Sequence, residues 1–203
     1  MYPNSAAHAV DGTIKLNKLQ SDKEEIVKLD DSIPWVKEIL DELESGLDDD
    51  DLTKITIPGK FKVDLLISKR HSEEYKDHVI VEGKITGGHN TPCIRCLVPT
   101  HITLDHDFLT VFFHPSFETN PDYAETTHIY VKDRDYELYF FDKGEINLKE
   151  LIHENGLLAT EPMPVHSEDC LGLCAHCGID LNFEKCKKRN HPECPQKITL
   201  VNS

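Results

Sequence analysis

The chain has 203 residues, enough for one domain with appendages or for two small domains. Hydrophobic residues make up 38% of it, a low share for a globular protein, so part of the chain is expected to contribute little to any core. The formal net charge of −15 repels phosphate backbones, which argues against nucleic acid as the main direct partner and favours a basic one. We expect a cytoplasmic protein, because the chain starts without an apolar secretory segment and has no apolar run of transmembrane length.

The first fifty residues are interpreted as a polar N-terminal segment with one amphipathic helix. Residues 1 to about 30 show no hydrophobic periodicity and are expected to be poorly ordered. Ser32 and Pro34 are start signals for a helix. Its inner face, with spacings of three and four residues, consists of Trp35, Ile39, Leu40, Leu43 and Leu47. The four aspartates at 48–51 follow and are interpreted as a solvated, self-repelling linker.

Residues 51–165 are predicted to form a β-rich core. Apolar residues alternate with threonines at Ile55 and Ile57, and a period of two returns in four longer runs. These runs contain Phe61, Val63, Leu65 and Ile67; Val79, Val81, Gly83 and Ile85; Ile102, Leu104, Phe108, Val111 and Phe113; and His128 to Val131. Turns of Gly, Asn and Pro between half-buried strands favour a mainly antiparallel sheet.

A second helix is predicted over residues 147–158, near the end of this core. Asn147 can cap it. Its inner stripe contains Leu148, Leu151, Ile152, Asn155 and Leu158. The remaining residues, 166–203, are rich in cysteine and too poor in apolar residues to fold on a core alone, which predicts a metal-dependent tail.

The seven cysteines are placed to hold metal rather than to form disulfides. An odd number suits disulfide pairing poorly, and disulfides are rare in a reducing cytosol. Cys93-x-x-Cys96 lies between two predicted strands, and the series Cys170, Cys174, Cys177, Cys186 and Cys194 follows the second helix. Two thiolates separated by two residues can bind one ion, because the turn between them directs both sulfurs inward. Sulfur-rich tetrahedral coordination favours zinc, with an iron–sulfur cluster as the alternative.

We expect no catalytic residues and no small-molecule substrate. A redox function for Cys93-x-x-Cys96 would need a helix N-terminus, whereas its surroundings indicate strand and turn. His166-x-Glu168 ahead of Cys174-x-x-Cys177 is similar to the zinc deaminase signature, but the two parts are too close together and the proline before the pair is replaced by leucine. The sequence contains no phosphate-binding loop, dinucleotide fingerprint or nucleophile elbow. A zinc-ribbon protein that binds nucleic acid remains the alternative, through the basic run at 185–189.

Three segments carry a resemblance to a known family. The first runs from Gly83 to Cys93-Ile-Arg-Cys96-Leu97, and the second from Glu145-Ile-Asn-Leu148 to Leu157-Leu158-Ala159. The third is Ser167-Glu-Asp-Cys170-Leu-Gly-Leu-Cys174-Ala-His-Cys177-Gly-Ile-Asp-Leu-Asn182. In order, they resemble the strand–C-x-R-C-L–strand element, the helix and the cysteine-rich tail of the YceD-like family, the large ribosomal RNA subunit accumulation proteins. The resemblance spans about residues 55–186.

The resemblance implies a non-enzymatic ribosome-biogenesis factor that supports accumulation of large-subunit ribosomal RNA. We expect its partner to be a pre-ribosomal large-subunit component, specifically a basic ribosomal protein, with direct RNA contact left open and no membrane association. The chain departs from the family in having His166 in place of the first tail cysteine, although histidine also binds zinc. Of the family's closing C-x-C only Cys186 remains, and Cys194 or His191 would have to replace its partner.

The expected fold is α+β, with a mainly antiparallel sheet, flanking helices and a C-terminal zinc-ribbon-like segment. Two divisions of the ligands are open. With two ions, Cys93, Cys96, His166 and Cys170 form one site, and Cys174, Cys177, Cys186 and Cys194 form the other. With one ion, the two Cys-x-x-Cys pairs share it and the remaining candidates are idle.

Overall fold

A computed structural model describes residues 9–123, 125–131 and 134–186 of the chain. The main sheet has six strands in the order β2-β3-β4-β5-β7-β6, and β1 pairs with β8 in a separate two-stranded sheet. The strands are β1 (Thr13–Lys15), β2 (Glu24–Asp30), β3 (Lys60–Ser72), β4 (Lys76–Pro92), β5 (Pro99–Phe113), β6 (His128–Val131), β7 (Arg134–Phe140) and β8 (Glu145–Asn147). The α-helices are α1 (Pro34–Leu43), α2 (Asp49–Leu52) and α3 (Leu148–Leu158), and short 3-10 turns lie at Leu16–Lys18 and Pro115–Phe117.

The described residues divide into two compact units. Residues 9–43, 59–89 and 103–160 form what we call the sheet unit, and residues 44–58, 90–102 and 161–186 form the cysteine unit. The last residues of β4 and the first residues of β5 belong to the cysteine unit. The chain therefore enters this unit along β4 and leaves it along β5.

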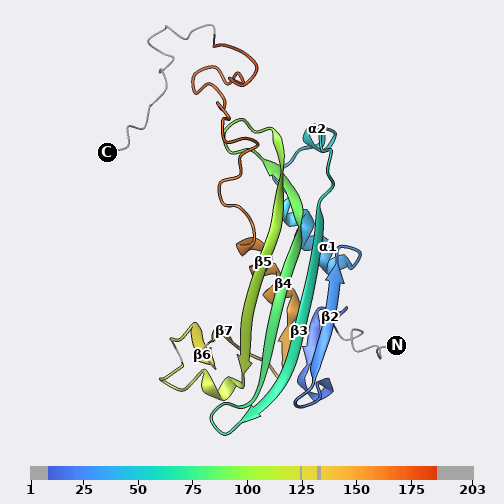
Figure 1. The fold of residues 1–203 in the computed structure, drawn as a ribbon, viewed down its shortest axis with the longest axis vertical. Coiled ribbons are helices and arrows are strands. Elements are labelled where there is room, and N and C mark those ends of the chain that lie inside the picture. Colours follow the sequence, from blue (N-terminus) through green and yellow to red (C-terminus); the bar gives the residue numbers. More distant parts are fainter. Residues whose placement is uncertain (1–8, 124, 132–133, 187–203) are drawn as a thin grey trace. The chain divides into compact units, whose positions relative to one another are not determined.

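The long strands of the sheet unit follow from the period-two pattern. β3 buries Phe61, Val63, Leu65 and Ile67, and it pairs with β4 in an antiparallel register that sets Leu65 opposite Gly83. A Cβ atom at Gly83 would lie 2.0 Å from the ring of Phe108, so a glycine is required for the Phe108 ring to pack here. The three strands β3, β4 and β5 run side by side in Figure 1. Between β5 and β7 the pairing is parallel, so the sheet is mixed.

Two helices of the sheet unit contribute to the same core. α1 buries Trp35, Val36, Ile39 and Leu40, and the indole nitrogen of Trp35 donates a 2.7 Å hydrogen bond to the carbonyl of Val10. α3 begins where expected, because the side-chain oxygen of Asn147 accepts a hydrogen bond from the backbone N–H of Glu150. Its buried face carries Leu148, Leu151, Ile152 and Asn155. These helices and the inward residues of β2 to β5 form one continuous apolar core.

Four local expectations were wrong. Leu158, expected on the inner stripe of the second helix, is 64% exposed, because α3 ends at this residue. Residues 9–30 are ordered and include β1 and the strand β2, which adds to the sheet beside β3 and buries only Val27 and Leu29. Ile55 and Ile57 lie in the irregular segment between α2 and β3 rather than in a strand. The first helix ends at Leu43, and the aspartate run forms the short helix α2, in which Asp48 accepts a hydrogen bond from the backbone N–H of Asp51. Within the described residues no helix has both the length and the apolar character needed to cross a membrane.

Candidate metal centre

Cys93 and Cys96 lie on a tight turn that joins β4 to β5 within the cysteine unit. The backbone N–H of Cys93 donates to the carbonyl of Val98, and the N–H of Leu97 donates to the carbonyl of Cys93, at 2.9 and 2.8 Å. Leu97 adopts a left-handed conformation with φ of 64°, which closes the turn. Both cysteines are buried although this turn is short. The Cys-x-x-Cys spacing therefore forms a knuckle, as is required for two sulfurs to share an ion.

The segment after α3 brings His166 and Cys170 to this knuckle. The backbone N–H of Ile94 donates to the carbonyl of Pro164 at 2.9 Å. The guanidinium of Arg95 donates to the carbonyls of Glu168 and Cys170 at 3.0 and 3.2 Å. These bonds hold two segments about seventy residues apart in the sequence against each other.

Four ligand atoms meet in what we call the first cluster: Cys93, Cys96, His166 and Cys170. They all lie within 4.8 Å of one another, with Cys93 Sγ 3.9 Å from Cys170 Sγ and Cys96 Sγ 3.2 Å from His166 Nδ1. Two sulfurs on a tetrahedral zinc ion, each at 2.3 Å, would be about 3.8 Å apart. A disulfide would need about 2.05 Å. The spacing therefore fits ligands around an ion, and the first cluster could hold a metal.

The pKa values of two neighbouring thiols in the first cluster are shifted in opposite directions. Burial acts to raise the pKa of Cys93, but hydrogen bonds from His166 and from the backbone of Arg95 and Cys96 outweigh it and lower that pKa to about 6. Burial raises the pKa of Cys96 to about 12, and its contacts with Cys93 and Cys170 add to the rise. Because a thiol binds metal as its thiolate, metal binding at Cys96 would release the proton that this raised pKa favours.

A second cluster contains Cys174, Cys177 and Cys186, whose sulfurs also lie within 4.8 Å of one another. The N–H of Gly178 donates to the carbonyl of Cys174 at 2.8 Å, and Gly178 adopts φ of 71°, a conformation that favours glycine. The sulfurs of Cys177 and Cys186 are 3.7 Å apart. Three ligands are thus in place, while the predicted fourth, Cys194, lies outside the described residues. This cluster too could hold a metal.

The six described cysteines fall into two spatial groups of three. None of the six forms a disulfide, and Cys93 and Cys96 group with Cys170 rather than with Cys174 and Cys177. A single ion shared by the two Cys-x-x-Cys pairs would need ligands that lie in different clusters.

Two residues of the site were missed, Arg95 and Asn182. Arg95 links the knuckle to the 166–173 segment, and the amide nitrogen of Asn182 donates to Cys170 Sγ at 3.6 Å. Neither residue type binds zinc, so ligand spacing holds no signal for them. In the sequence, the one sign of their role was that both lie within the segments that resemble the YceD-like family.

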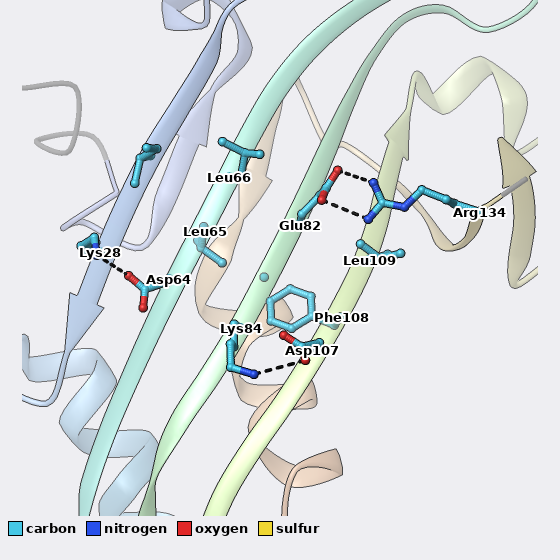
Figure 2. A pocket seen from close by; sticks show the side chains of 12 residues that line it. Lys28, Asp64, Leu65, Leu66, Glu82, Lys84, Asp107, Phe108, Leu109 and Arg134 are labelled. Carbon is cyan, nitrogen blue, oxygen red and sulfur yellow. Dashed lines mark hydrogen bonds and ion pairs between the residues drawn. The ribbon is translucent and has the colours of Figure 1, made fainter. Parts of the chain in front are cut away.

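The sheet unit has a groove of its own, of about 610 Å³, on the sheet surface. Figure 2 shows that its charged side chains pair between strands, with Lys28–Asp64 and Lys84–Asp107 joining neighbouring strands and Arg134 of β7 reaching past β5 to Glu82 of β4. Lys28 lies 3.0 Å from Asp64, Arg134 binds Glu82 through two bonds of 2.8 and 3.0 Å, and Lys84 contacts Asp105 and Asp107. Because each of these cations is already neutralised, the groove lacks the character of an anion-binding site.

These features define a protein in which two ligand clusters, one of them on a turn between strands, could hold metal ions. The sequence model of the family described as large ribosomal RNA subunit accumulation protein YceD matches residues 81–197, more than half of the chain. The chain therefore belongs to the YceD family, as its motifs had indicated.

The chain is also similar to "Uncharacterized protein ML1660" of Mycobacterium leprae (strain TN), with 28% identity over 112 residues. The match covers 55% of this chain and 47% of that protein, so it spans about half of the relative's length. No solved structure matches the chain.

Proposed function

We propose that this protein is a non-enzymatic ribosome-biogenesis factor that supports accumulation of large-subunit ribosomal RNA and is held in shape by structural zinc. The match to the YceD family carries the role in RNA accumulation, since the family description names it. The four ligand atoms gathered within 4.8 Å at the first cluster support the metal.

Zinc is the ion that suits these ligands best. Thiolate and imidazole ligands in a tetrahedral arrangement favour zinc over the hard cations, which take oxygen ligands. A site with four protein ligands leaves no position for an activated water molecule. The first cluster, with three cysteines and one histidine, is therefore suited to a structural role, and this supports action through binding rather than catalysis.

The partner that we propose is a basic protein of the assembling large subunit. A chain with a net charge of −15 attracts basic proteins and repels free RNA. The segments around the first cluster also expose the apolar side chains of Ile94, Leu97, Val98, Met163 and Leu171. Exposed apolar side chains on an acidic chain suit a basic protein surface better than a phosphate backbone.

The direct test has two measurements. The first follows the tagged protein through a sucrose gradient of cell lysate, and the second measures the ratio of large- to small-subunit ribosomal RNA in cells depleted of the protein. The wild-type protein is expected to sediment with pre-ribosomal large-subunit particles, and depletion is expected to lower the ratio. A Cys93→Ser/Cys96→Ser variant should fail to restore it, whereas Glu184→Gln, an exposed non-ligand change, should succeed. Protein that stays at the top of the gradient, with an unchanged RNA ratio after depletion, would contradict the proposed role.

The alternative is a zinc-ribbon protein that binds nucleic acid directly. The observation in its favour is the basic run at 185–189, of which only Lys185 and Cys186 are described. A filter-binding assay with naked ribosomal RNA separates the two functions. The basic-partner proposal predicts weak binding that declines steeply with salt, and tight, salt-resistant binding would favour the alternative.

A further inference from the structure

Asn182 connects the two clusters, although it ligates neither. It lies in the loop between Cys177 and Cys186 of the second cluster. Its amide nitrogen nevertheless donates to Cys170 Sγ of the first cluster, at 3.6 Å. Cys170 is buried, so this N–H provides its sulfur with a hydrogen-bond donor inside the protein. A residue that belongs to one cluster by sequence thus supports a ligand of the other.

The orientation of this amide is fixed by its other bonds. The side-chain oxygen of Asn182 accepts a 2.8 Å hydrogen bond from the backbone N–H of Leu171. The side-chain nitrogen also donates to a carboxylate oxygen of Asp180 at 2.7 Å. A flipped amide would place an oxygen against that carboxylate and an NH₂ group against the N–H of Leu171. The nitrogen must therefore face Cys170.

The backbone of the second cluster holds Asn182 in this position. Leu173 and Asp180 form an antiparallel bridge, and the N–H of Leu181 donates to the carbonyl of Gly172 at 2.9 Å. Inside this hairpin the N–H of Cys174 donates to the carbonyl of Ile179 at 2.8 Å. The hairpin thus spans the Cys174–Cys177 knuckle, and any ion that binds there fixes the hairpin that presents Asn182.

We propose that Asn182 is a positioning residue for the metal at the first cluster, and that through it the second cluster raises the metal affinity of the first. This inference rests on the proposed metal binding. An N–H that donates to a ligating thiolate spreads its negative charge and orients the sulfur, and losing such support costs about 10- to 100-fold in metal affinity. Because the hairpin supplies the donor, a filled second cluster pre-organises Cys170 for the first ion.

The test measures metal affinity at the first cluster in the full-length protein, by chelator competition with cadmium. Cadmium-113 NMR distinguishes a site with three sulfurs and one nitrogen from a site with sulfur ligands alone. Asn182→Asp keeps the shape of the side chain but replaces the N–H donor with an acceptor. It is expected to lower first-cluster affinity about 10- to 100-fold. Glu184→Gln, two residues further along the same loop, should leave that affinity unchanged.

A double-mutant cycle tests the coupling. Cys174→Ser/Cys177→Ser should lower first-cluster affinity by a similar factor, and adding Asn182→Asp in that background should cause little further loss. Wild-type affinity in Asn182→Asp, or losses that simply multiply, would overturn the inference while leaving metal binding intact. A wild-type protein that binds no cadmium would instead refute the underlying metal proposal.

Discussion

The sheet unit and the cysteine unit bury opposite kinds of residue. The sheet unit has a continuous core of large apolar side chains contributed by strands and both long helices. In the cysteine unit the most buried side chains are mainly cysteines, in two small groups, each joined by only one or two partly buried apolar residues. Several of its large apolar side chains are exposed instead, among them Ile94, Leu97, Leu171 and Phe183.

This contrast indicates two sources of order in one chain. Burial of apolar area stabilises the sheet unit, at about 25 cal/mol per Å². The cysteine unit has little such area to bury, and small segments of this kind depend on metal for their folding. The two units should therefore respond differently to the loss of ligands, to core truncation and to pH.

The largest expected effect is the loss of the cysteine unit when ligands are removed. Structural zinc sites contribute about 10–16 kcal/mol of apparent binding free energy, which the Cys93→Ser/Cys96→Ser variant would lose at the first cluster. In an amide NMR spectrum, the signals of the cysteine unit should lose their dispersion while those of the sheet unit stay in place. Glu184→Gln should retain all signals. A variant spectrum in which the cysteine unit keeps its dispersion would argue against metal as the source of order.

The second prediction compares two leucines. Leu151 is 2% exposed in the sheet unit, and Leu171 is 51% exposed in the cysteine unit. Leu151→Ala should lower the free energy of unfolding of the sheet unit by about 2–5 kcal/mol, because it leaves a cavity. Leu171→Ala should change stability by no more than about 0.5 kcal/mol. Urea unfolding checks both, and comparable losses from the two variants would erase the contrast.

The third prediction is that the two units lose stability at opposite ends of the pH scale. In the sheet unit, burial and the neighbouring Glu74 raise the pKa of Tyr75 to about 12. The unfolded chain ionises this tyrosine near pH 10, so its stabilising contribution is complete below pH 10 and is lost as the pH rises toward 12. The cysteine unit should instead fail in acid, since protons compete with metal for its thiolates.

Unfolding experiments from pH 8 to 12, with Tyr75→Phe as the control, measure the alkaline effect. Metal release from pH 7 down to pH 4, followed with a colorimetric chelator, measures the acid effect. The Tyr75→Phe variant should lose less stability above pH 10 than the wild type. Equal losses in both proteins would show that Tyr75 is not responsible.

The smallest expected effect concerns the ion pairs of the groove in Figure 2. Arg134 and Glu82 form a bidentate pair, but both side chains are partly exposed to solvent. A double-mutant cycle of Arg134→Ala and Glu82→Ala should yield a coupling energy of at most about 1 kcal/mol, and less at high salt. A larger coupling energy would show that polar contacts, and not only apolar burial, contribute substantially to the stability of the sheet unit.

The fold could be predicted where one residue pattern decided the outcome. Period-two alternation located β3, β4 and β5, and the Asn147 cap located α3. β2 was missed because it buries only Val27 and Leu29 in a highly charged stretch. Ile55 and Ile57 alternate as in a strand, yet they lie in an irregular segment that pairs with none of the described strands. Ile55 is half-buried there and Ile57 is exposed.

The site could be predicted only in part, for a different physical reason. Cysteine spacing identifies a knuckle, because both ligands are local. The approach of His166 and Cys170 to the first knuckle depends on bonds made by Arg95 and Pro164, which no spacing rule contains. The support that Asn182 provides to Cys170 is likewise a contact between loops that only the folded chain reveals.

The most direct test of the account is the number of zinc ions in the purified chain, measured by native mass spectrometry and elemental analysis. We predict about two ions per chain, falling to about one in a Cys186→Ser/Cys194→Ser variant, because the first cluster keeps all four of its own ligands in that variant. If the wild type holds only one ion and the variant retains it, the second cluster binds no metal and the two-ion prediction is wrong. A wild-type chain free of metal that keeps the cysteine unit folded in chelator would contradict the central claim.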